Sequence, residues 1–197
     1  IQGENPAMSD PDAGHAREAL ARLDHLVVQD IFLTETASLA DVVLPATAWP
    51  EKTGSVTNTD RCVQIGHKAL NAPGEARADA WITEQIARRL GQDWRYDIHA
   101  DGTASDNPAQ GIGAVFEEMR ALMPSIAGLS WPRLWREQAV TYPVHDVGDP
   151  GHPIVFIDHF PTPTGRARLV PASPKPPAEV PDADYPLVLI TGRQLEH

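Results

Sequence analysis

The chain has 197 residues, enough for one domain or a domain and part of a second, and 42% of them are hydrophobic, which suffices for a buried core. Its formal net charge is −11, with 27 acidic and 16 basic residues, and no cluster of Lys or Arg points to a nucleic-acid binder. The longest apolar runs are far too short to cross a bilayer. These features predict an acidic cytoplasmic protein with no membrane span in this segment and no nucleic acid as partner.

Cys62 is the single cysteine of the sequence. One thiol cannot form an internal disulfide or a cysteine-ligated zinc or iron–sulfur site, and such usage fits a reducing compartment. We therefore expect no metal ligand in this chain. Residues 1–4 show no signal peptide, and the chain closes one loop beyond an apolar segment. Both ends predict a fragment of a longer protein.

The first 95 residues alternate helical and strand-like patterns. Residues 9–11 offer a helix start, and apolar residues recur at helical spacing over residues 13–23. An apolar strand is predicted at residues 26–28, a helical turn at 34–37, and a second strand at 42–44. This order favours a Rossmann-like, mostly parallel α/β sheet with flanking helices. Ligands of such sheets bind beyond the carboxyl ends of the strands.

The second half of the chain predicts a helical and loop extension. Helices are expected over residues 79–90, capped by Gly91, and over 113–123 and 131–138, with a surface loop at 97–111. The Pro-rich residues 171–181 indicate an extended linker, and residues 187–190 a new strand. The predicted organisation is an α/β region at residues 1–95, the extension and linker at 96–180, and the start of a further domain at 181–197.

Familiar enzyme signatures are missing: the sequence has no G-x-G-x-x-G, Walker, G-x-S-x-G or H-E-x-x-H motif. Three polar features remain as candidates. Residues 3–6 suit close approach of a ligand, or a simple strand-to-helix turn. Asp30, directly after Gln29 at a strand's end, suits acceptance from ribose or guanine, or a loop anchor. Residues 51–64 suit a polar pocket in which Arg61 pairs with phosphate, or a solvated β-hairpin.

Taken in order, these segments resemble one family. The matching segments are residues 3–6 (GENP), 28–37 (VQDIFLTETA), 40–46 (ADVVLPA), Glu51, Gly54, 57–61 (TNTDR), 63–64 (VQ), 161–167 (PTPTGRA) and 185–193 (YPLVLITGR). They resemble the molybdopterin oxidoreductases of the dimethyl-sulfoxide-reductase type, and within them the formate dehydrogenase alpha subunits.

The resemblance implies a catalytic subunit that holds molybdenum, or tungsten, between two molybdopterin guanine dinucleotides. Such a subunit oxidises formate to carbon dioxide and passes two electrons to iron–sulfur clusters bound outside this chain. Diaphorase-type iron–sulfur and flavin subunits would carry them to NAD. Residues 181–197 would begin the C-terminal dinucleotide-binding β-barrel domain.

By position, the resemblance also assigns a cofactor-binding set: Gly3, Asn5, Ser9, Gln29, Asp30, Ala46, Asp79, Arg193 and His197. Ser9 is assigned on the further ground that it lies near a helix start, where backbone N–H groups favour phosphate. The metal ligand and the catalytic Arg of the family belong upstream of Ile1, so we expect no catalytic residue here.

Two alternatives stay open. One is a related molybdopterin enzyme that acts on nitrate or another oxyanion, and the other is a non-catalytic scaffold like the large iron–sulfur subunit of respiratory complex I. Retention of residues 3–6 together with Gln29 and Asp30 argues against the scaffold.

Overall fold

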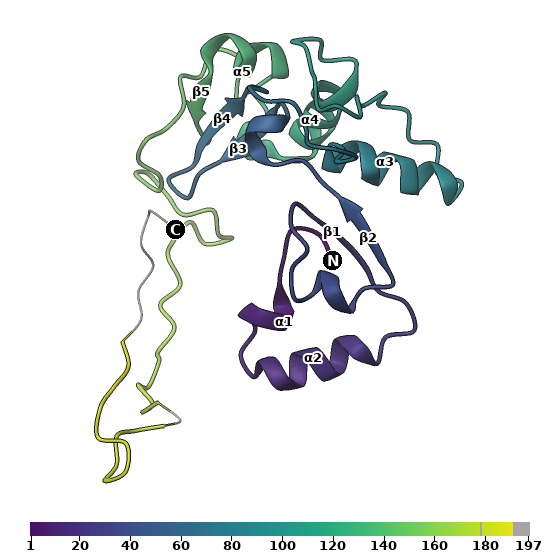
Figure 1. Cartoon of the computed structure of the whole chain (residues 1–197). Coiled ribbons are helices and arrows are strands. Elements are labelled where there is room, and N and C mark those ends of the chain that lie inside the picture. Colours follow the sequence, from purple (N-terminus) through teal and green to yellow (C-terminus); the bar gives the residue numbers. More distant parts are fainter. Residues whose placement is uncertain (178, 191–197) are drawn as a thin grey trace. The chain divides into compact units, whose positions relative to one another are not determined.

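The structure is a computed structural model that describes residues 1–177 and 179–190 (Figure 1). The chain divides into two compact units, the first covering Ile1–Val155 and the second beginning at Phe156. All helices and strands of the described residues lie in the first unit. None of these helices is both long enough and apolar enough to cross a membrane.

A parallel strand pair forms the early part of the first unit. Strands β1 (Val27–Asp30) and β2 (Val42–Pro45) pair in parallel over their full lengths. The chain start extends this pair, because Gln2 lies in a parallel bridge with Gln29. On the other side, Ala46 bridges in parallel to Arg77. The predicted parallel pairing is therefore confirmed for these strands, which bury Leu26, Val28 and Ala37 as a small core.

Two helices, α1 (Pro6–Ser9) and α2 (Ala13–Ala21), precede β1 in the sequence, and the 3-10 turn η1 (Ala37–Leu39) lies between β1 and β2. The helix predicted over residues 13–23 is confirmed, but its predicted start at residues 9–11 is wrong. Asp12 is the N-cap instead, and its carboxylate accepts from the His15 N–H at 3.2 Å. A side-chain acceptor at the N-cap satisfies one of the backbone N–H groups that have no partner within the first turn of a helix.

The larger sheet is antiparallel, so the expectation of a mostly parallel sheet is wrong for this chain. After the 3-10 turn η2 (Trp49–Glu51), strands β3 (Gly54–Thr57) and β4 (Cys62–Gly66) form a hairpin, and β5 (Ala139–Thr141) adds to β4. The hairpin interpretation of residues 51–64 is confirmed. The fold is thus mixed α/β, with one sheet of each kind.

The remaining helices are α3 (Asp79–Arg89), α4 (Gly111–Leu122), the 3-10 turn η3 (Pro124–Ile126) and α5 (Trp131–Glu137), which confirms the three predicted helices. Of these, α4, η3 and α5 contribute side chains, together with β4 and β5, to the main core. The buried cluster comprises Val63, Ile65, Phe116, Ile126, Leu129, Trp131, Leu134, Val140 and Val144. Trp131 also satisfies its indole N–H, which donates to the Ser105 carbonyl oxygen at 2.8 Å.

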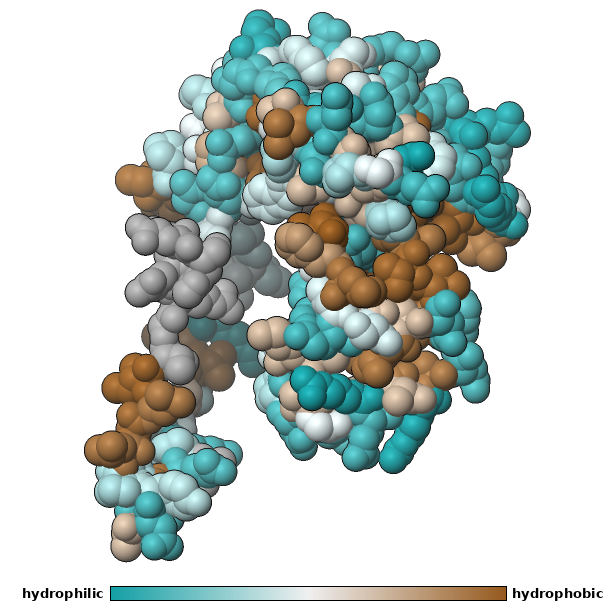
Figure 2. All heavy atoms as spheres, viewed as in Figure 1, coloured by the Kyte–Doolittle hydropathy of each residue, from teal (hydrophilic) through white to brown (hydrophobic). Residues whose placement is uncertain are grey.

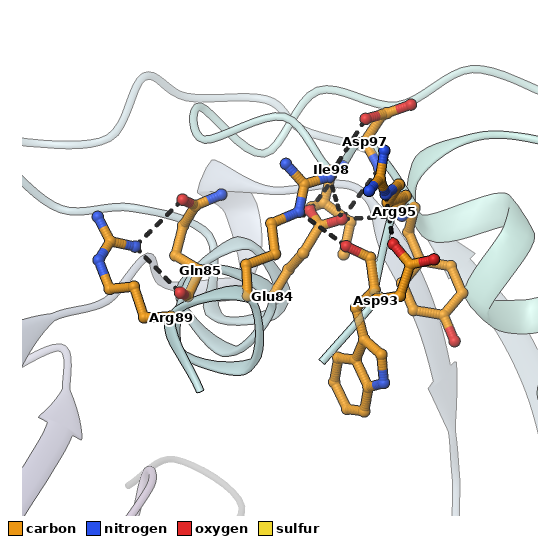
Figure 3. A network of polar contacts seen from close by, with 10 residues as sticks. Glu84, Gln85, Arg89, Asp93, Arg95, Asp97 and Ile98 are labelled. Atoms are coloured by element: carbon orange, nitrogen blue, oxygen red, sulfur yellow. Dashed lines mark hydrogen bonds and ion pairs between the residues drawn. The ribbon is translucent and has the colours of Figure 1, made fainter. Parts of the chain in front are cut away.

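A buried carboxylate fixes α3 to the loop that follows it (Figure 3). Glu84 accepts from the backbone N–H groups of Tyr96, Asp97 and Ile98, and Arg88 pairs with the same carboxylate. Three backbone N–H groups and the Arg88 guanidinium satisfy the Glu84 carboxylate, so the fold tolerates burial of its negative charge. This contact holds residues 96–98 of the loop beside Glu84 of α3.

Residues 187–190 of the second unit do not form the predicted first strand of a barrel. A strand is held by hydrogen bonds to a neighbouring strand, and no strand pairing joins the described residues of this unit. The four apolar side chains are exposed instead. Exposed apolar side chains also follow β1, at Ile31, Phe32 and Leu33. Figure 2 shows patches of hydrophobic residues on the face in view.

Candidate functional site at the edge of the parallel strands

The carboxyl ends of the parallel segments meet at one edge of the fold. Gly3 N–H donates to the Gln29 carbonyl oxygen at 2.9 Å, and Ala46 N–H donates to the Asp30 carbonyl oxygen at 3.0 Å. The structure therefore brings together four of the residues that the sequence assigns to the cofactor, namely Gly3, Gln29, Asp30 and Ala46. Ala46 also bridges to Arg77, and Asp79, the first residue of α3, follows Arg77 by two positions.

Asp79 is the centre of the polar contacts at this edge. Its Oδ1 accepts from Gln29 Nε2 at 2.9 Å, and its Oδ2 contacts Lys52 Nζ. The two charged side chains are partly covered, with exposed fractions of 25% for Asp79 and 28% for Lys52. Burial by itself raises the pKa of Asp79, but the hydrogen bonds from Lys52 and Gln29 and the lysine charge outweigh it and hold the pKa below its ordinary value.

Lys52 and Thr47 belong to this site, and the sequence did not assign either of them. Lys52 Nζ also donates to the Thr47 carbonyl oxygen at 2.7 Å, which ties the loop after β2 to Asp79. The Thr47 hydroxyl is buried and meets no hydrogen-bond partner among the described residues. Lys52 lies inside the polar stretch noted above, but nothing local in the sequence links it to a carboxylate 27 positions later.

Asn5 serves the fold directly. Its Oδ1 accepts from the Thr36 N–H at 3.1 Å and from the Thr36 hydroxyl at 2.8 Å, and its Nδ2 donates to Glu35 Oε2 at 2.7 Å. The Asn5 hydrogen bond is also the main reason that the pKa of Glu35 lies below its ordinary value. The amide thus joins the turn before α1 to the segment after β1, which confirms the strand-to-helix turn.

Gly3 and Asp30 shape the backbone at the edge. Gly3 has φ +61°, and a Cβ there would meet nothing within 4 Å, so the backbone lies open on that side. Asp30 Oδ1 accepts from the Ile31 N–H at 2.7 Å and from the Phe32 N–H at 3.4 Å. Asp30 is therefore a loop anchor, and contact with a ligand remains a separate prediction.

Ser9 and Arg61 make contacts within the fold that the sequence did not predict. Ser9 ends α1, so the predicted helix start at this residue is wrong, and its hydroxyl donates to the Asn5 carbonyl oxygen at 3.1 Å. The guanidinium of Arg61 donates to the carbonyl oxygens of Tyr142, His152 and Pro153. The contact of Ser9 with the cofactor and the pairing of Arg61 with phosphate stay predictions.

Three further assignments are Ala46, Arg193 and His197. Ala46 is buried beside Asp30, whereas Arg193 and His197 lie outside the described residues. Within residues 1–177 and 179–190, no three His, Cys, Asp or Glu side chains gather in a way that could hold a metal ion. A pocket of about 390 Å³ lies along Arg88, Trp94 and Arg95, and no predicted site residue lines it. Both arginines there are paired with carboxylates.

Comparison with known proteins agrees with the order of these segments. Residues 1–89 match the family model described as molybdopterin oxidoreductase. The full chain is 43% identical to the F420-dependent formate dehydrogenase subunit alpha of Methanocaldococcus jannaschii and covers 28% of it. Over 98% of this chain, the assimilatory nitrate reductase catalytic subunit of Bacillus subtilis is 36% identical, and 26% of that subunit is covered.

A solved structure shows the same fold. The acetylene hydratase from Pelobacter acetylenicus superposes on 83% of this chain and 20% of its own, with a TM-score of 0.50 and 20% sequence identity. The chain spans little more than a quarter of the length of the two curated relatives described above.

Proposed function

We propose that this chain, which belongs to the molybdopterin oxidoreductase family, is the segment of a formate dehydrogenase catalytic subunit that grips one guanine dinucleotide of the cofactor. The observation that carries the proposal is the gathering of Gly3, Asp30, Ala46 and Asp79 at the carboxyl edge of the parallel strands. Ligands of such sheets bind at this edge.

The donor set at the edge fits a nucleotide. A carboxylate has about four lone-pair sites, and the contacts of Asp79 with Gln29 and Lys52 use one on each oxygen. The other two suit a ligand that presents paired N–H donors, as guanine does. The buried Thr47 hydroxyl is a further polar group at this edge without a partner among the described residues. Gly3 leaves its side of the backbone open to a ligand.

The cofactor, when bound, would supply the two-electron redox chemistry at molybdenum or tungsten. The residues of this chain bind and orient: Asp79 accepts, Gln29 and Lys52 hold Asp79, and Asp30 anchors the loop after β1. Iron–sulfur clusters, and the catalytic metal ligand itself, would be held by other parts of a cytoplasmic catalytic subunit. Arg193 and His197 remain proposed contacts to the pterin.

The electron acceptor is proposed to be F420 rather than NAD. The relative from Methanocaldococcus jannaschii is named as F420-dependent, and no comparison supports the diaphorase-type NAD partner expected from the sequence. Nitrate is the second substrate to test, because the Bacillus subtilis relative is a nitrate reductase. The scaffold alternative predicts no cofactor at all.

The test uses the full-length subunit that contains this chain, made in a cofactor-competent host. Metal, released guanine nucleotide and formate-dependent reduction of F420 and of NAD are measured in the same preparation. About two guanine nucleotides per metal, with formate activity, support the proposal. If metal and nucleotide are present but the protein reduces only nitrate, the proposed substrate becomes nitrate instead of formate. The absence of both metal and nucleotide overturns the proposal.

An Asp30→Ala variant tests the edge itself. We expect a lower content of guanine nucleotide per subunit, because the loop anchored through Ile31 and Phe32 would no longer be held at the edge. Asp60→Ala is the matched control, since Asp60 makes the same kind of turn contact, to the Cys62 N–H, within the β3–β4 hairpin. An equal loss in both variants would contradict the site.

A further inference from the structure

The loop between α3 and α4 is bonded to the chain on both sides of the candidate site. The Ala100 carbonyl oxygen accepts from the Ala78 N–H at 2.9 Å, and the Gly102 carbonyl oxygen accepts from the Thr53 N–H at 2.8 Å. Each of these two donors is the chain neighbour of one member of the ion pair at the site. A shift of the loop therefore moves one charged residue relative to the other.

Gly102 comes closer to the backbone around Lys52 than a residue with a side chain could. A Cβ at position 102 would lie 2.7 Å from Lys52 Cβ, and 2.8 Å from both Lys52 Cα and the Glu51 carbonyl oxygen. None of these atoms is the flexible end of a side chain, so the turn at residues 51–52 would have to move. Gly102 also has φ +74°, a conformation that favours glycine.

The loop has supports of its own, apart from the ion pair. Asp101 Oδ1 accepts from the Thr103 N–H at 3.1 Å and from the Thr103 hydroxyl at 2.8 Å. Lys68 Nζ donates to the Asp101 carbonyl oxygen at 2.6 Å and pairs with Asp101 Oδ2 at 3.4 Å. The loop thus presents its carbonyl oxygens to the site from a braced backbone.

We propose that residues 100–102 form a positioning loop for the nucleotide site, with Gly102 setting the spacing between Lys52 and Asp79. The inference rests on the proposed function and adds residues that do not themselves touch the ligand. The loop lies outside residues 1–89, which match the family model, so the match by itself assigns it no role. Retention of the nucleotide then depends on a segment beyond the strands that bind it.

The test compares Gly102→Ala with wild type in the full-length subunit that contains this chain, made in a cofactor-competent host. Guanine nucleotide released per folded subunit is measured after gel filtration, together with the thermal midpoint. We expect about a tenfold lower nucleotide content in Gly102→Ala, because crowding of the backbone at residues 51–52 displaces one side of the site.

Gly91→Ala is the matched control for backbone strain. Gly91 has φ +83°, close to that of Gly102, but a Cβ there would meet nothing within 4 Å. Alanine is strained at both positions, so both variants should melt below wild type. Only Gly102→Ala should lose nucleotide, since only there does the new methyl group contact the site.

Lys68→Met is the second variant, and it decides the case if Gly102→Ala does not fold. It removes the cation that holds Asp101 and adds no atom beside Lys52. We expect about a threefold lower nucleotide content, a smaller effect because Asp101 is partly exposed and such pairs are weak. Lys68→Arg keeps the charge and should restore most of the content.

The outcomes separate this inference from the proposed function. A folded Gly102→Ala protein with the wild-type nucleotide content would overturn the inference, and so would an equal loss in Gly91→Ala, since strain alone would then explain the fall. If Gly102→Ala does not fold, full nucleotide content in Lys68→Met overturns it as well. Wild-type protein without guanine nucleotide would instead overturn the proposed function.

Discussion

Replacement of Glu84 by Gln tests how α3 is held to the loop that follows it. The Glu84 side chain is 2% exposed. Its Oε1 accepts from the N–H groups of Tyr96 at 2.8 Å and Asp97 at 3.1 Å and from Arg88 Nη2 at 3.1 Å, and its Oε2 accepts from the Ile98 N–H at 3.1 Å (Figure 3). Gln has the same shape but carries an NH₂ group in place of one oxygen.

The less costly orientation of Gln keeps its oxygen where three donors converge. The NH₂ group then faces the Ile98 N–H, so two donors oppose each other and one hydrogen bond is lost. A hydrogen bond to a charged group contributes about 1.5–3 kcal/mol, so we expect a loss of about 2 kcal/mol at this contact. Since about 1.4 kcal/mol corresponds to a factor of ten, the opening equilibrium of the loop rises about thirtyfold.

Hydrogen–deuterium exchange measures this opening locally. In the full chain carrying Glu84→Gln, we expect the Ile98 amide to exchange about thirtyfold faster, with smaller changes at Tyr96 and Asp97. Glu18→Gln is the control, because Glu18 is 70% exposed and pairs with Arg22 within one helix, an interaction that contributes under about 1 kcal/mol. Unchanged exchange at Ile98 in Glu84→Gln would refute the reasoning.

Three further substitutions test other contacts of the first unit. Arg133→Met removes a buried guanidinium that donates to three backbone carbonyl oxygens, and about 3 kcal/mol of lost stability should lower the thermal midpoint by about 6–12 °C. A fall below about 2 °C would contradict this role. In Gly128→Ala the new Cβ would lie 2.1 Å from the Asp146 carbonyl oxygen, so the midpoint should fall by about 4 °C or more, whereas Gly148→Ala, with open space around it, should melt within about 1 °C of wild type. Equal melting of the two alanine variants would show that the backbone relaxes. The pKa of Asp79 is lower in the folded state than its ordinary value of 3.8. The ionised carboxylate therefore contributes its full stabilisation of the fold above pH 3.8, and this contribution is lost as the pH falls from 3.8 through the lower pKa of the folded state. Asp79→Asn should therefore flatten the acid limb of stability against pH, measured by denaturant unfolding, and an unchanged limb would exclude this contribution.

The predicted electron acceptor rested on the resemblance alone. The order of motifs from Gly3 to Asp30 and onward pointed to the molybdopterin oxidoreductases, and residues 1–89 match the model of that family. The NAD-linked partner rested on the same resemblance and has no support in the relatives compared. Motifs at the strand edge are proposed to contact the cofactor, and they carry no information on a partner that would bind elsewhere.

The sequence by itself determined the local elements of this protein. Apolar residues at a helical period predicted α3, α4 and α5, and continuous apolar runs predicted β1 and β2 with their parallel pairing. The polar residues after those strands predicted where the candidate edge would lie. Such features are visible in sequence because hydrogen bonding and burial within a helix or strand depend on residues a few positions apart.

Only the tertiary structure decided which side chains meet. Lys52 and Asp79 are 27 positions apart, Gln29 and Asp79 are 50 apart, and Arg61 reaches carbonyl oxygens more than 80 positions away. Packing of separate segments brings these groups together, and no local pattern encodes it. The same reason explains residues 187–190, since an apolar run becomes a strand only where another strand supplies its hydrogen bonds.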